Sequence, residues 1–386
     1  MKLLRIISSI KPEKGGPINA ARQIDRLINA SACSIEVLTL DEEFSTDYPA
    51  KVHFTGPSRL GYGFNSNIEH WLEKNAHQYD FFIINGLWQY HGFAARKVLN
   101  KSCRPYIVYT HGMLDPWFKK AFPLKHLKKW LYWPWGEYKI LRDAKAVIFT
   151  SEEERIRARE SFWLYKAKEL VTAYGTSGPP LNRQVLSDQY LTKNPELINK
   201  RIILFLSRIH EKKGCDLLIK AFATAAMEHK DLHLVMAGPD QNGYKRKLNE
   251  LAEQLNIADR ISWPGMLQGD DKWGAFYTAE VFCLPSHQEN FGIVVAEALA
   301  CGKPVLISNK VNIWHEIETD MVGFVDEDDT SGTLRNIERW LALDNDTYQK
   351  MSRRAEQCFT LRFHIDRAAE RLIEIAKEHI NDYPRQ

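Results

Sequence analysis

Short apolar runs alternate with stretches of helical spacing along the chain. In the second half, the apolar runs cover residues 201–207, 232–237, 260–263, 281–285 and 304–307. The stretches between them space their apolar residues as amphipathic helices do, over 214–229, 244–256, 270–278 and 291–300. A short continuous apolar run is typical of a strand buried on both faces of a sheet. Strict alternation of strand and helix therefore predicts βαβ units and a parallel sheet with helices on both sides.

The first half shows the same pattern with longer loops. Its strand candidates cover residues 3–10, 35–40, 81–84, 106–110 and 146–150. A chain of 386 residues is too long for one ordinary core, so two domains are expected. The predicted parts are a Rossmann-like domain over 1–175, a linker over 176–199, a second Rossmann-like domain over 200–360, and a C-terminal helical segment over 361–386 that can pack back on the first domain. Two such doubly wound α/β domains are expected to face each other across a cleft, with ligands beyond the carboxyl ends of the strands.

Charge is distributed unevenly along the chain. Residues 1–180 carry 26 Lys/Arg and 18 Asp/Glu, whereas the remainder carries 26 and 31, so that the total is only +3. A basic first half suggests an anionic partner for that half, although uneven solvated charge gives the same count.

The beginning of the chain and its cysteines indicate a compartment. The first apolar run resembles a signal peptide, but Arg5 interrupts it and no small-residue cleavage site follows, so a buried first strand is expected. The six cysteines form no C-x-x-C pair and show no zinc-site spacing, which is typical of free thiols in a reducing compartment. The chain has no run of 18 apolar residues, so no membrane-spanning helix is expected. We expect a cytoplasmic protein that can sit peripherally on the inner face of the cell membrane.

Two glutamates stand out in the stretch LPSHQENFGIVVAEALACGKPVL. Glu289 lies in the loop after a predicted strand, and Glu297 follows eight residues later inside the next helix. Phe291, Gly292 and Ile293 open that helix, so their backbone N–H groups have no partner within it. A helix N-terminus with a glycine favours an anion, and a carboxylate beside it can accept hydrogen bonds from sugar hydroxyls. A helix-capping acid and an ordinary helical glutamate would give the same spacing.

Three further features lie after predicted strands. Arg208 and Lys213, in LFLSRIHEKKGCDLLIKAF, can hold a diphosphate and offset the charge that develops as it leaves, or can form a solvated basic loop. Gly15 and Gly16 follow the first strand, where backbone N–H groups can approach a phosphate or simply form a turn. His111, in YTHGMLDPW, follows the fourth strand, where it can serve a ligand site or be an ordinary structural histidine.

Neither a metal site nor a cofactor is expected. The D-x-D pairs lie in polar, turn-like stretches near helix starts, where capping explains them: Asp326 and Asp328, and Asp344 and Asp346. The chain has neither G-x-G-x-x-G nor a P-loop motif.

A basic aromatic segment begins at Trp117 and ends at Arg142. Its sequence, WFKKAFPLKHLKKWLYWPWGEYKILR, has seven Lys/Arg and one acid, Glu137, with aromatic residues interleaved. This composition is typical of an interfacial patch on an anionic membrane. A helical hairpin that buries its aromatics in the domain explains it too. Single-stranded nucleic acid would suit the composition, but is not expected as a partner.

Together these segments resemble the glycosyltransferase group 1 enzymes, also called glycosyltransferase family 4, which are retaining enzymes of the GT-B fold. The resemblance covers nearly the whole chain and is strongest over 201–306. The matching residues are the two glutamates Glu289 and Glu297, the R-x4-K-G residues Arg208 and Lys213, the glycines Gly15 and Gly16 of the first loop, and the histidine His111. The stretches HGMLDPW and FTSEEE look like those of a subgroup that builds bacterial exopolysaccharide, capsule or lipopolysaccharide.

The resemblance implies roles and a reaction. The domain over 1–175 would be the acceptor domain, and the domain over 200–360 would be the nucleotide-sugar domain. Arg208 and Lys213 would bind the donor diphosphate, Gly16 would touch it, Glu297 would hold the ribose, and Glu289 and His111 would hold the donor sugar. The protein would be a retaining, metal-independent hexosyltransferase that uses a UDP- or GDP-sugar as substrate, without a cofactor, and a glycan or lipid-linked acceptor. Two alternatives are a non-enzymatic membrane-surface binding module and a sugar-nucleotide epimerase of the same fold.

Overall fold

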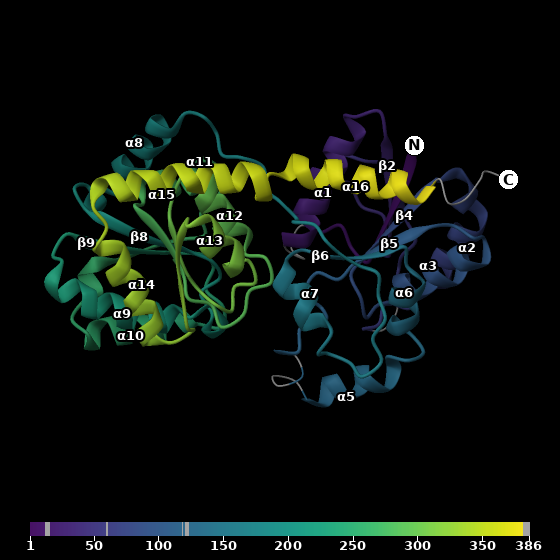
Figure 1. Ribbon diagram of the computed structural model, residues 1–386, viewed down its shortest axis with the longest axis horizontal. Coiled ribbons are helices and arrows are strands. Elements are labelled where there is room, and N and C mark those ends of the chain that lie inside the picture. The colour runs from purple at the N-terminus through teal and green to yellow at the C-terminus, as the bar shows by residue number, and fades with distance from the viewer. Residues whose placement is uncertain (12–15, 59–60, 118, 120–122, 381–386) are drawn as a thin grey trace. The chain divides into compact units, whose positions relative to one another are not determined.

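The computed structural model describes residues 1–11, 16–58, 61–117, 119 and 123–380 (Figure 1). The chain forms two compact units. Unit 1 comprises Met1–Ser177 together with Ile365–Gln386, and unit 2 comprises Gly178–His364.

Unit 1 contains a seven-stranded parallel sheet in the order β3-β2-β1-β4-β5-β6-β7. Its strands are β1 (Lys2–Ile7), β2 (Ser34–Thr39), β3 (Val52–Phe54), β4 (Phe81–Asn85), β5 (Tyr106–Tyr109), β6 (Ala146–Phe149) and β7 (Glu169–Val171). The chain runs outward from β1 to β3 and then returns to place β4 on the other side of β1. The topological switch point of this sheet therefore lies between β1 and β4.

Helices cover both faces of the unit 1 sheet (Figure 1). The helices of this unit are α1 (Gly16–Asn29), α2 (Ser66–Asn75), α3 (Tyr90–Lys101), α5 (Pro123–Tyr132), α6 (Glu137–Asp143), α7 (Glu152–Ala158) and α16 (Ile365–Ile380), of which α5 lies away from the strands (Figure 1). The C-terminal helix α16 packs against α1, whereas α3 packs against α2 and α6. Continuous apolar strands fill the core between these layers, with Phe82, Tyr106 and Trp133 among its fully buried side chains.

Unit 2 contains a six-stranded parallel sheet in the order β10-β9-β8-β11-β12-β13. Its strands are β8 (Arg201–Leu206), β9 (Leu232–Ala237), β10 (Ile261–Gly265), β11 (Val281–Leu284), β12 (Val305–Ser308) and β13 (Gly323–Asp326). Here the order reverses between β8 and β11, so this pair forms the switch point of the second sheet.

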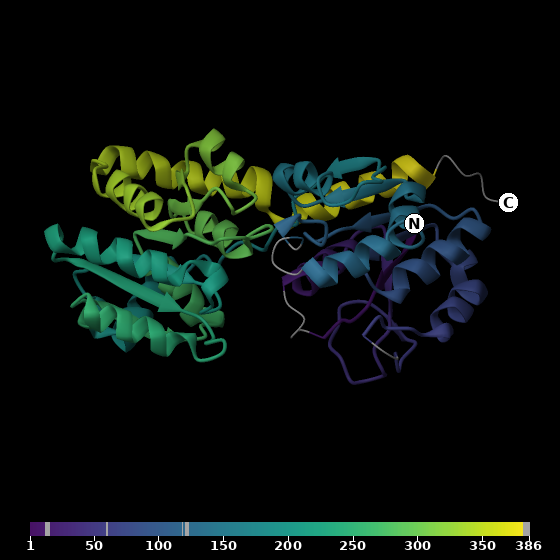
Figure 2. The same ribbon diagram turned by 90° about the horizontal axis from the view of Figure 1, so that it is seen from below.

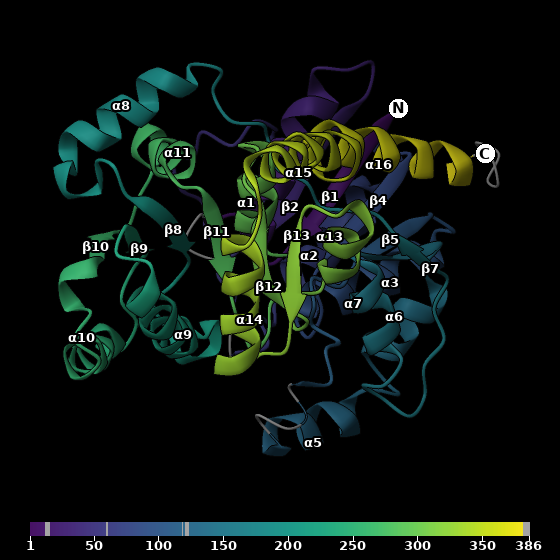
Figure 3. The ribbon, with the colours of Figure 1, turned by 60° about the vertical axis from the view of Figure 1, so that its left-hand side comes forward.

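The strands of unit 2 lie between two layers of helices, as Figure 2 shows. The helices are α8 (Arg183–Lys193), α9 (Cys215–Glu228), α10 (Tyr244–Gln254), α11 (Gly269–Thr278), α12 (Ile293–Ala300), α13 (Trp314–Asp320), α14 (Thr330–Leu341) and α15 (Asn345–Cys358). In Figure 3, α9, α10 and α14 cover one face, and α8, α11 and α15 cover the other. The packing of α9 on α10 and α14, and of α8 on α11, agrees with this arrangement.

Every strand expected from an apolar run is present, and so is the parallel arrangement. The strands that the pattern did not predict are β3, β7 and β13, and each is an edge strand of its sheet. Their residues are mostly half-exposed, so they lack the continuous apolar run that marks a strand buried on both faces.

The segment 176–199 differs from the expected linker because it contains a helix. Within it, α8 packs on α11 and buries Leu186 and Tyr190. These two residues lie four positions apart, which is enough for one narrow apolar face on an otherwise polar helix. The overall composition of the segment hides such a face.

Candidate functional site

In unit 2, the loops that follow β8 and β11 are tied together at the switch point. The backbone oxygen of Lys212 accepts hydrogen bonds from the backbone N–H of His287 at 2.9 Å and from Ser286 Oγ at 3.1 Å. Gly214 has φ +66, and a Cβ there would lie 2.1 Å from the backbone oxygen of Pro285. Only glycine allows this approach, so the two loops keep one fixed spacing.

This spacing brings Lys213 and Glu289 into an ion pair. Lys213 is 5% exposed, and the side chain of Glu289 is 22% exposed. The backbone of Glu289 is held on both sides, since its N–H donates to Lys310 O at 2.9 Å and its oxygen accepts from Asn312 N–H at 3.0 Å. Two residues 76 positions apart in the sequence thus form one charge pair at the carboxyl end of the sheet.

Arg208 lies in the same loop as Lys213 but is exposed. Its Nη1 donates a long hydrogen bond of 3.4 Å to Gln241 Oε1. Within the described part of the chain, no carboxylate lies within ion-pair distance of its guanidinium. Arg208 is therefore a cation available to an anionic ligand at this edge of the sheet.

The beginning of α12 follows directly. Gly292 is the N-cap with φ +70, and Ile293 is the first helical residue. The N–H groups of Gly292 and Ile293 have no hydrogen-bond partner among the residues that the structure describes, as at other helix starts. Phe291 is 6% exposed and packs edge-on against Phe363 at 5.6 Å. Its side chain therefore belongs to the core, and only its backbone can face a ligand.

Glu297 is buried in α12, at 7% exposure, but it has a partner. Lys272 of α11 donates to Glu297 Oε1 at 2.9 Å. Sequence reasoning did not identify Lys272 as this partner. Nothing in the local sequence connects the two residues, because the pairing depends on how α11 and α12 lie in the fold.

In unit 1, α1 begins at Gly16, shortly after β1. Gly16 is therefore placed at a helix start near the β1/β4 switch point, as expected for a backbone that approaches a phosphate. Gly15 lies outside the described residues.

His111 follows β5 and is held from several sides. Its Nε2 lies 3.0 Å from Asn85 Nδ2. Its ring stacks on Tyr109 at 5.6 Å and meets Tyr174 edge-on at 5.1 Å. The backbone of His111 has φ +50, in the left-handed region that only a small share of residues other than glycine occupies. Burial, together with the charge of Arg5, lowers the pKa of His111 to about 3, so the imidazole is neutral.

The loop that carries His111 is clamped by a buried carboxylate. Glu154, at 3% exposure, accepts from Thr110 Oγ1 and from the backbone N–H of Gly112, each at 2.6 Å, and from the N–H of Thr150 at 2.7 Å. It ties the loop after β5 to the loop after β6. Glu154 belongs to the FTSEEE stretch, which the sequence singled out without assigning this role.

Three more residues that sequence reasoning did not assign to the site lie beneath His111. Arg5, Asp25 and Asn85 are all buried and joined by hydrogen bonds. The available signals were a charged residue inside the apolar run of β1 and a polar residue at the end of β4. Sequence reasoning used only the first of these signals, Arg5, and used it as an argument against a signal peptide.

The basic aromatic segment divides into a buried and an exposed part. Trp133 is fully buried and its indole donates to Leu164 O. In contrast, α5 has no buried residue. Leu124 is 83% exposed and Leu131 62%, and Trp135 beyond the helix is 71% exposed. The segment is therefore not a hairpin that buries all of its aromatics. Phe118, Lys120 and Phe122 lie outside the described residues.

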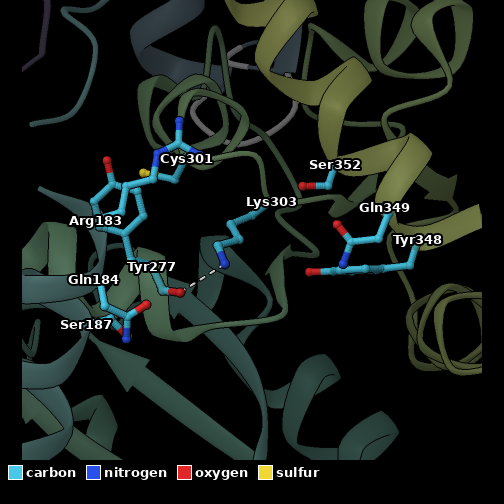
Figure 4. Close-up of a pocket in the computed structure, with 9 residues that line it drawn as sticks. All are labelled: Arg183, Gln184, Ser187, Tyr277, Cys301, Lys303, Tyr348, Gln349 and Ser352. Atoms are coloured by element: carbon cyan, nitrogen blue, oxygen red, sulfur yellow. Dashed lines mark hydrogen bonds between the residues drawn. The ribbon is translucent and has the colours of Figure 1, made fainter. Parts of the chain in front are cut away.

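A polar pocket of about 260 Å³ in unit 2 contains none of the predicted site residues (Figure 4). Lys303 extends into it and donates to Tyr277 O at 3.0 Å. Burial lowers the pKa of Lys303 to about 8. Lys303 precedes β12 and Tyr277 precedes β11, so the pocket lies toward the amino ends of the strands. The candidate ligand-binding groups follow the carboxyl ends, where ligands of doubly wound sheets bind.

Within the described residues, no group of three or more His, Cys, Asp or Glu side chains is arranged to hold a metal ion. Asp344 instead caps α15 through the N–H of Thr347, and Asp326 pairs with Arg335. Asp328 contacts His287 at 2.8 Å. No described helix is both long and apolar enough to cross a membrane.

Two sequence families match the two units. The family described as "Glycosyl transferases group 1" matches residues 188–358, and the "Glycosyl transferase 4-like domain" matches residues 20–175. D-inositol 3-phosphate glycosyltransferase of Salinispora tropica is 30% identical over 192 residues, which is 47% of this chain and 39% of that protein. The chain thus spans about two fifths of the length of this curated relative.

Solved structures share the fold over nearly the full length. Anabaena Alr3699/HepE in complex with UDP gives a TM-score of 0.78 at 18% identity and covers 98% of this chain and 100% of its own. WaaG, a glycosyltransferase involved in lipopolysaccharide biosynthesis, gives 0.67 at 16% identity and covers 96% and 99%. The predicted GT-B class, with two Rossmann-like parallel sheets, is confirmed. The second half of the chain thus matches the group 1 glycosyltransferases, and the first half matches the glycosyl transferase 4-like domain.

Proposed function

We propose that the protein is a retaining glycosyltransferase that moves a sugar from a nucleotide-diphosphate sugar to a glycan or lipid-linked acceptor. The observation that carries this proposal is the Lys213–Glu289 pair at the β8/β11 switch point, with the exposed Arg208 in the same loop. Two cations suit a diphosphate, and a carboxylate beside them suits sugar hydroxyls. A general surface-binding module has no need for this combination.

Each group has a proposed role in donor binding. Arg208 and Lys213 hold the diphosphate, Glu289 accepts hydrogen bonds from the donor sugar, and Glu297 accepts them from the ribose. Lys272 orients the Glu297 carboxylate through their 2.9 Å contact. The free N–H groups at the start of α12 offer further donors to an anion. In unit 1, we propose that Gly16 approaches the diphosphate and that His111 binds the donor sugar.

The proposed reaction exchanges one bond at the anomeric carbon for another on the same face of the sugar. The bond from the anomeric carbon to the β-phosphate oxygen breaks, and a bond to the acceptor oxygen forms. The departing phosphate oxygen takes the proton of the acceptor hydroxyl. Arg208 and Lys213 stabilise the charge that develops on the diphosphate, which is the function that a metal ion serves in other enzymes. We propose that this protein needs no metal.

We propose a UDP- or GDP-sugar as the donor and a role in bacterial exopolysaccharide, capsule or lipopolysaccharide synthesis. HepE, whose fold this chain shares, was solved in complex with UDP, and this supports a uridine nucleotide. The likeness to WaaG supports envelope sugar chemistry.

A screen of donor hydrolysis tests the proposal. UDP-, GDP- and ADP-sugars are incubated with the protein, and the released nucleotide is measured. We expect slow release from one nucleotide class. Lys213→Met should abolish it, whereas Lys247→Met, which removes an exposed lysine of the same unit, should not. If no nucleotide sugar is hydrolysed and none raises the melting temperature, the proposal is wrong.

We further propose that the enzyme acts in the cytoplasm at an anionic membrane surface, to which the basic aromatic segment binds. The exposed helix α5 presents Leu124, Leu127 and Leu131 together with Lys125 and Lys128. Exposed leucines gain from insertion between lipids, and each lysine near an anionic leaflet adds about 1 kcal/mol.

Vesicle binding tests this location. We expect binding to phosphatidylserine-containing vesicles that weakens as salt rises, and little binding to neutral vesicles. Replacing four lysines of the segment with glutamate should abolish binding but preserve donor hydrolysis. The four are Lys119, Lys120, Lys128 and Lys129. The matched control places the same four charge reversals elsewhere in unit 1, at Lys51, Lys74, Lys101 and Lys166. Absence of binding at low salt would show that the acceptor is reached in solution.

A further inference from the structure

A chain of buried polar side chains leads to His111 through the β1/β4 switch point of unit 1. Arg5 projects from β1, Asp25 from α1 and Asn85 from the end of β4. Arg5 is 1% exposed, Asp25 0% and Asn85 3%. Arg5 Nε and Nη2 contact Asp25 Oδ1 at 2.9 and 2.6 Å, Arg5 Nη1 donates to Asn85 Oδ1 at 2.8 Å, and Asn85 Nδ2 lies 3.0 Å from His111 Nε2.

The direction of each hydrogen bond in this chain is fixed by chemistry. A guanidinium has donors and no acceptor, so the atom of Asn85 that faces Arg5 must be the amide oxygen. The amide nitrogen then faces His111, and an amide nitrogen only donates. His111 Nε2 must therefore accept and carries no proton. The usual ambiguities of amide orientation and histidine tautomer are removed because this row of hydrogen-bonded side chains begins at an arginine.

Asp25 prevents Arg5 from turning away. Its carboxylate accepts hydrogen bonds from both Nε and Nη2 of the guanidinium, and it also accepts one from Tyr48 Oη at 2.8 Å. Burial by itself would lower the pKa of Arg5, but the Asp25 carboxylate beside it raises that pKa above its ordinary value. Arg5 remains a cation, and Asn85 always meets a donor on that side.

A neutral His111 with an unprotonated Nε2 carries its proton on Nδ1. His111 is half-buried, and Nδ1 has no hydrogen-bond partner among the described residues. The ring cannot easily rotate to exchange its nitrogens, since it stacks on Tyr109 with an interplanar angle of 13° and meets Tyr174 at 82°. Glu154 holds the adjoining backbone at Gly112. The structure thus presents one N–H group in a fixed orientation.

We propose that Asn85, held by Arg5 and Asp25, is a positioning residue that fixes His111 as a neutral hydrogen-bond donor through Nδ1, aimed at an oxygen atom of the substrate. The substrate atom, a sugar hydroxyl or a phosphate oxygen, rests on the proposed glycosyl transfer; the tautomer does not. In this arrangement His111 neither abstracts a proton as a general base nor supplies a positive charge.

The surroundings of His111 keep it neutral over the physiological range. Among the residues that the structure describes, the ionisable groups near His111 are Arg5 from β1, with Asp25 of α1 behind it, Tyr109 from β5 and Tyr174 from the loop after β7. Burial raises the pKa of Tyr109 to about 12 and that of Tyr174 well above its ordinary value, so both are uncharged. The low pKa of His111 agrees with these surroundings.

His91 provides an internal reference with the opposite tautomer. Its Nε2 lies 2.9 Å from the backbone oxygen of Asn85, which can only accept, so Nε2 must carry the proton. His91 is fully buried, and burial lowers its pKa to about 4. One asparagine thus fixes two histidines in opposite protonation patterns, through its side-chain nitrogen and its backbone oxygen.

Nitrogen NMR of histidine-labelled full-length protein tests the tautomer directly. Long-range ¹H–¹⁵N spectra distinguish protonated from unprotonated ring nitrogens, and His111→Gln and His91→Gln assign the signals. From pH 5 to 8 we expect a protonated Nδ1 and an unprotonated Nε2 for His111, and the reverse for His91. A protonated Nε2, or a doubly protonated ring, at His111 overturns the proposal whether or not the protein turns over any donor.

Asn85→Asp tests the positioning role. A carboxylate at this position only accepts hydrogen bonds, so His111 Nε2 must carry a proton to donate to it. The signal of that nitrogen should change to the protonated type, and His111 should begin to titrate between pH 5 and 8. Turnover should be flat over this range in the wild type and should acquire a slope with pH in the variant. Asn67→Asp makes the same chemical change at an exposed position of unit 1 and should alter neither signal nor slope.

A second variant covers the case in which Asn85→Asp does not fold. Asn85→Ala removes the donor without adding charge, so His111 should populate both tautomers and turnover should fall about threefold to tenfold, as expected for one lost hydrogen bond. A wild-type tautomer and a wild-type rate in this variant would overturn the positioning role. If the NMR results hold but no nucleotide sugar supports turnover, only the proposed function fails.

Discussion

The two sheets of this protein reverse their strand order in the same way, yet they place opposite electrostatic environments at the two switch points. Between β1 and β4, the side chains of Arg5 and Asp25 are 1% and 0% exposed, and their charges are neutralised inside the unit. Between β8 and β11, the Lys213 side chain is 6% exposed, its partner Glu289 is 22% exposed, and Arg208 lies at the surface.

The difference shows how one topology serves two tasks. In unit 1, the buried ion pair does not face a ligand but orients an amide, which in turn orients a neutral histidine. In unit 2, Arg208 lies at the surface, where an anion can reach it, beside the less exposed Lys213. A closed charge pair gives geometry, and an open one gives affinity for charge.

Breaking the closed pair should have the largest effect. Arg5→Met leaves the Asp25 carboxylate buried without its cation, which typically costs about 3–5 kcal/mol. Hydrogen exchange of the β1 and β4 amides, which reports on unit 1 by itself, should show that loss of protection. Arg367→Met removes an exposed pair with Glu370 and should change exchange by less than about 1 kcal/mol. Equal effects of the two variants would contradict the comparison.

Breaking the open cluster should affect catalysis and leave the fold intact. Arg208→Ala or Lys213→Ala should lower the turnover number about 100-fold or more, as the loss of one preorganised charge stabiliser does elsewhere. The melting temperature should change less for the exposed Arg208 than for Lys213, whose removal leaves Glu289 without its partner. Transfer rates near the wild-type value in both variants would exclude these residues from diphosphate binding.

The two glutamates of unit 2 should separate sugar from nucleotide recognition. Glu289→Gln should weaken the intact donor, and Glu297→Gln should also weaken the free nucleoside diphosphate, each by about 10- to 100-fold, the range for a lost charge-assisted hydrogen bond. Calorimetric titration with nucleoside diphosphate measures the difference. The same affinity of both variants for the free nucleotide would show that the roles are not divided.

The closed region of unit 1 should lose stability on mild acidification. Because burial lowers the folded pKa of His91 to about 4, the unfolded chain binds a proton below pH 6.5 that the folded chain does not. The contribution of His91 to stability is therefore present above pH 6.5 and is lost as pH falls toward 4, by about 1 kcal/mol at pH 5.5. His91→Gln should remove this part of the slope in hydrogen exchange of β4. The exposed His70, changed to Gln, serves as the control.

Metal removal should have the smallest effect. Since Arg208 and Lys213 are proposed to offset the charge of the leaving diphosphate, turnover should persist in excess EDTA. The initial rate with and without chelator is the measurement. Loss of activity on chelation that added Mn²⁺ restores would mean that the open cluster is incomplete without a cation.

The sequence by itself determined the buried strands and the order of the chemistry-bearing segments. Continuous apolar runs such as 201–207 and 232–237 fit only strands covered on both faces, so their positions and the parallel sheet could be predicted from local pattern. Arg208, Lys213, Glu289 and His111 could be selected for the same reason, since each follows such a strand and ligands bind at that end of the sheet.

Only the tertiary structure decided which of these residues meet and what supports them. The pairing of Lys213 with Glu289 spans 76 positions, and that of Asn85 with His111 spans 26. Residue pairs so far apart in the sequence cannot be predicted from periodicity, because a contact between loops depends on strand order and not on spacing along the chain. The edge strands β3, β7 and β13 and the polar helix α8 were not predicted for a related reason, since their half-buried residues form no continuous apolar run. The protonation of His111 depends on an arginine two strands away, because hydrogen-bond direction is passed on only through atoms in contact.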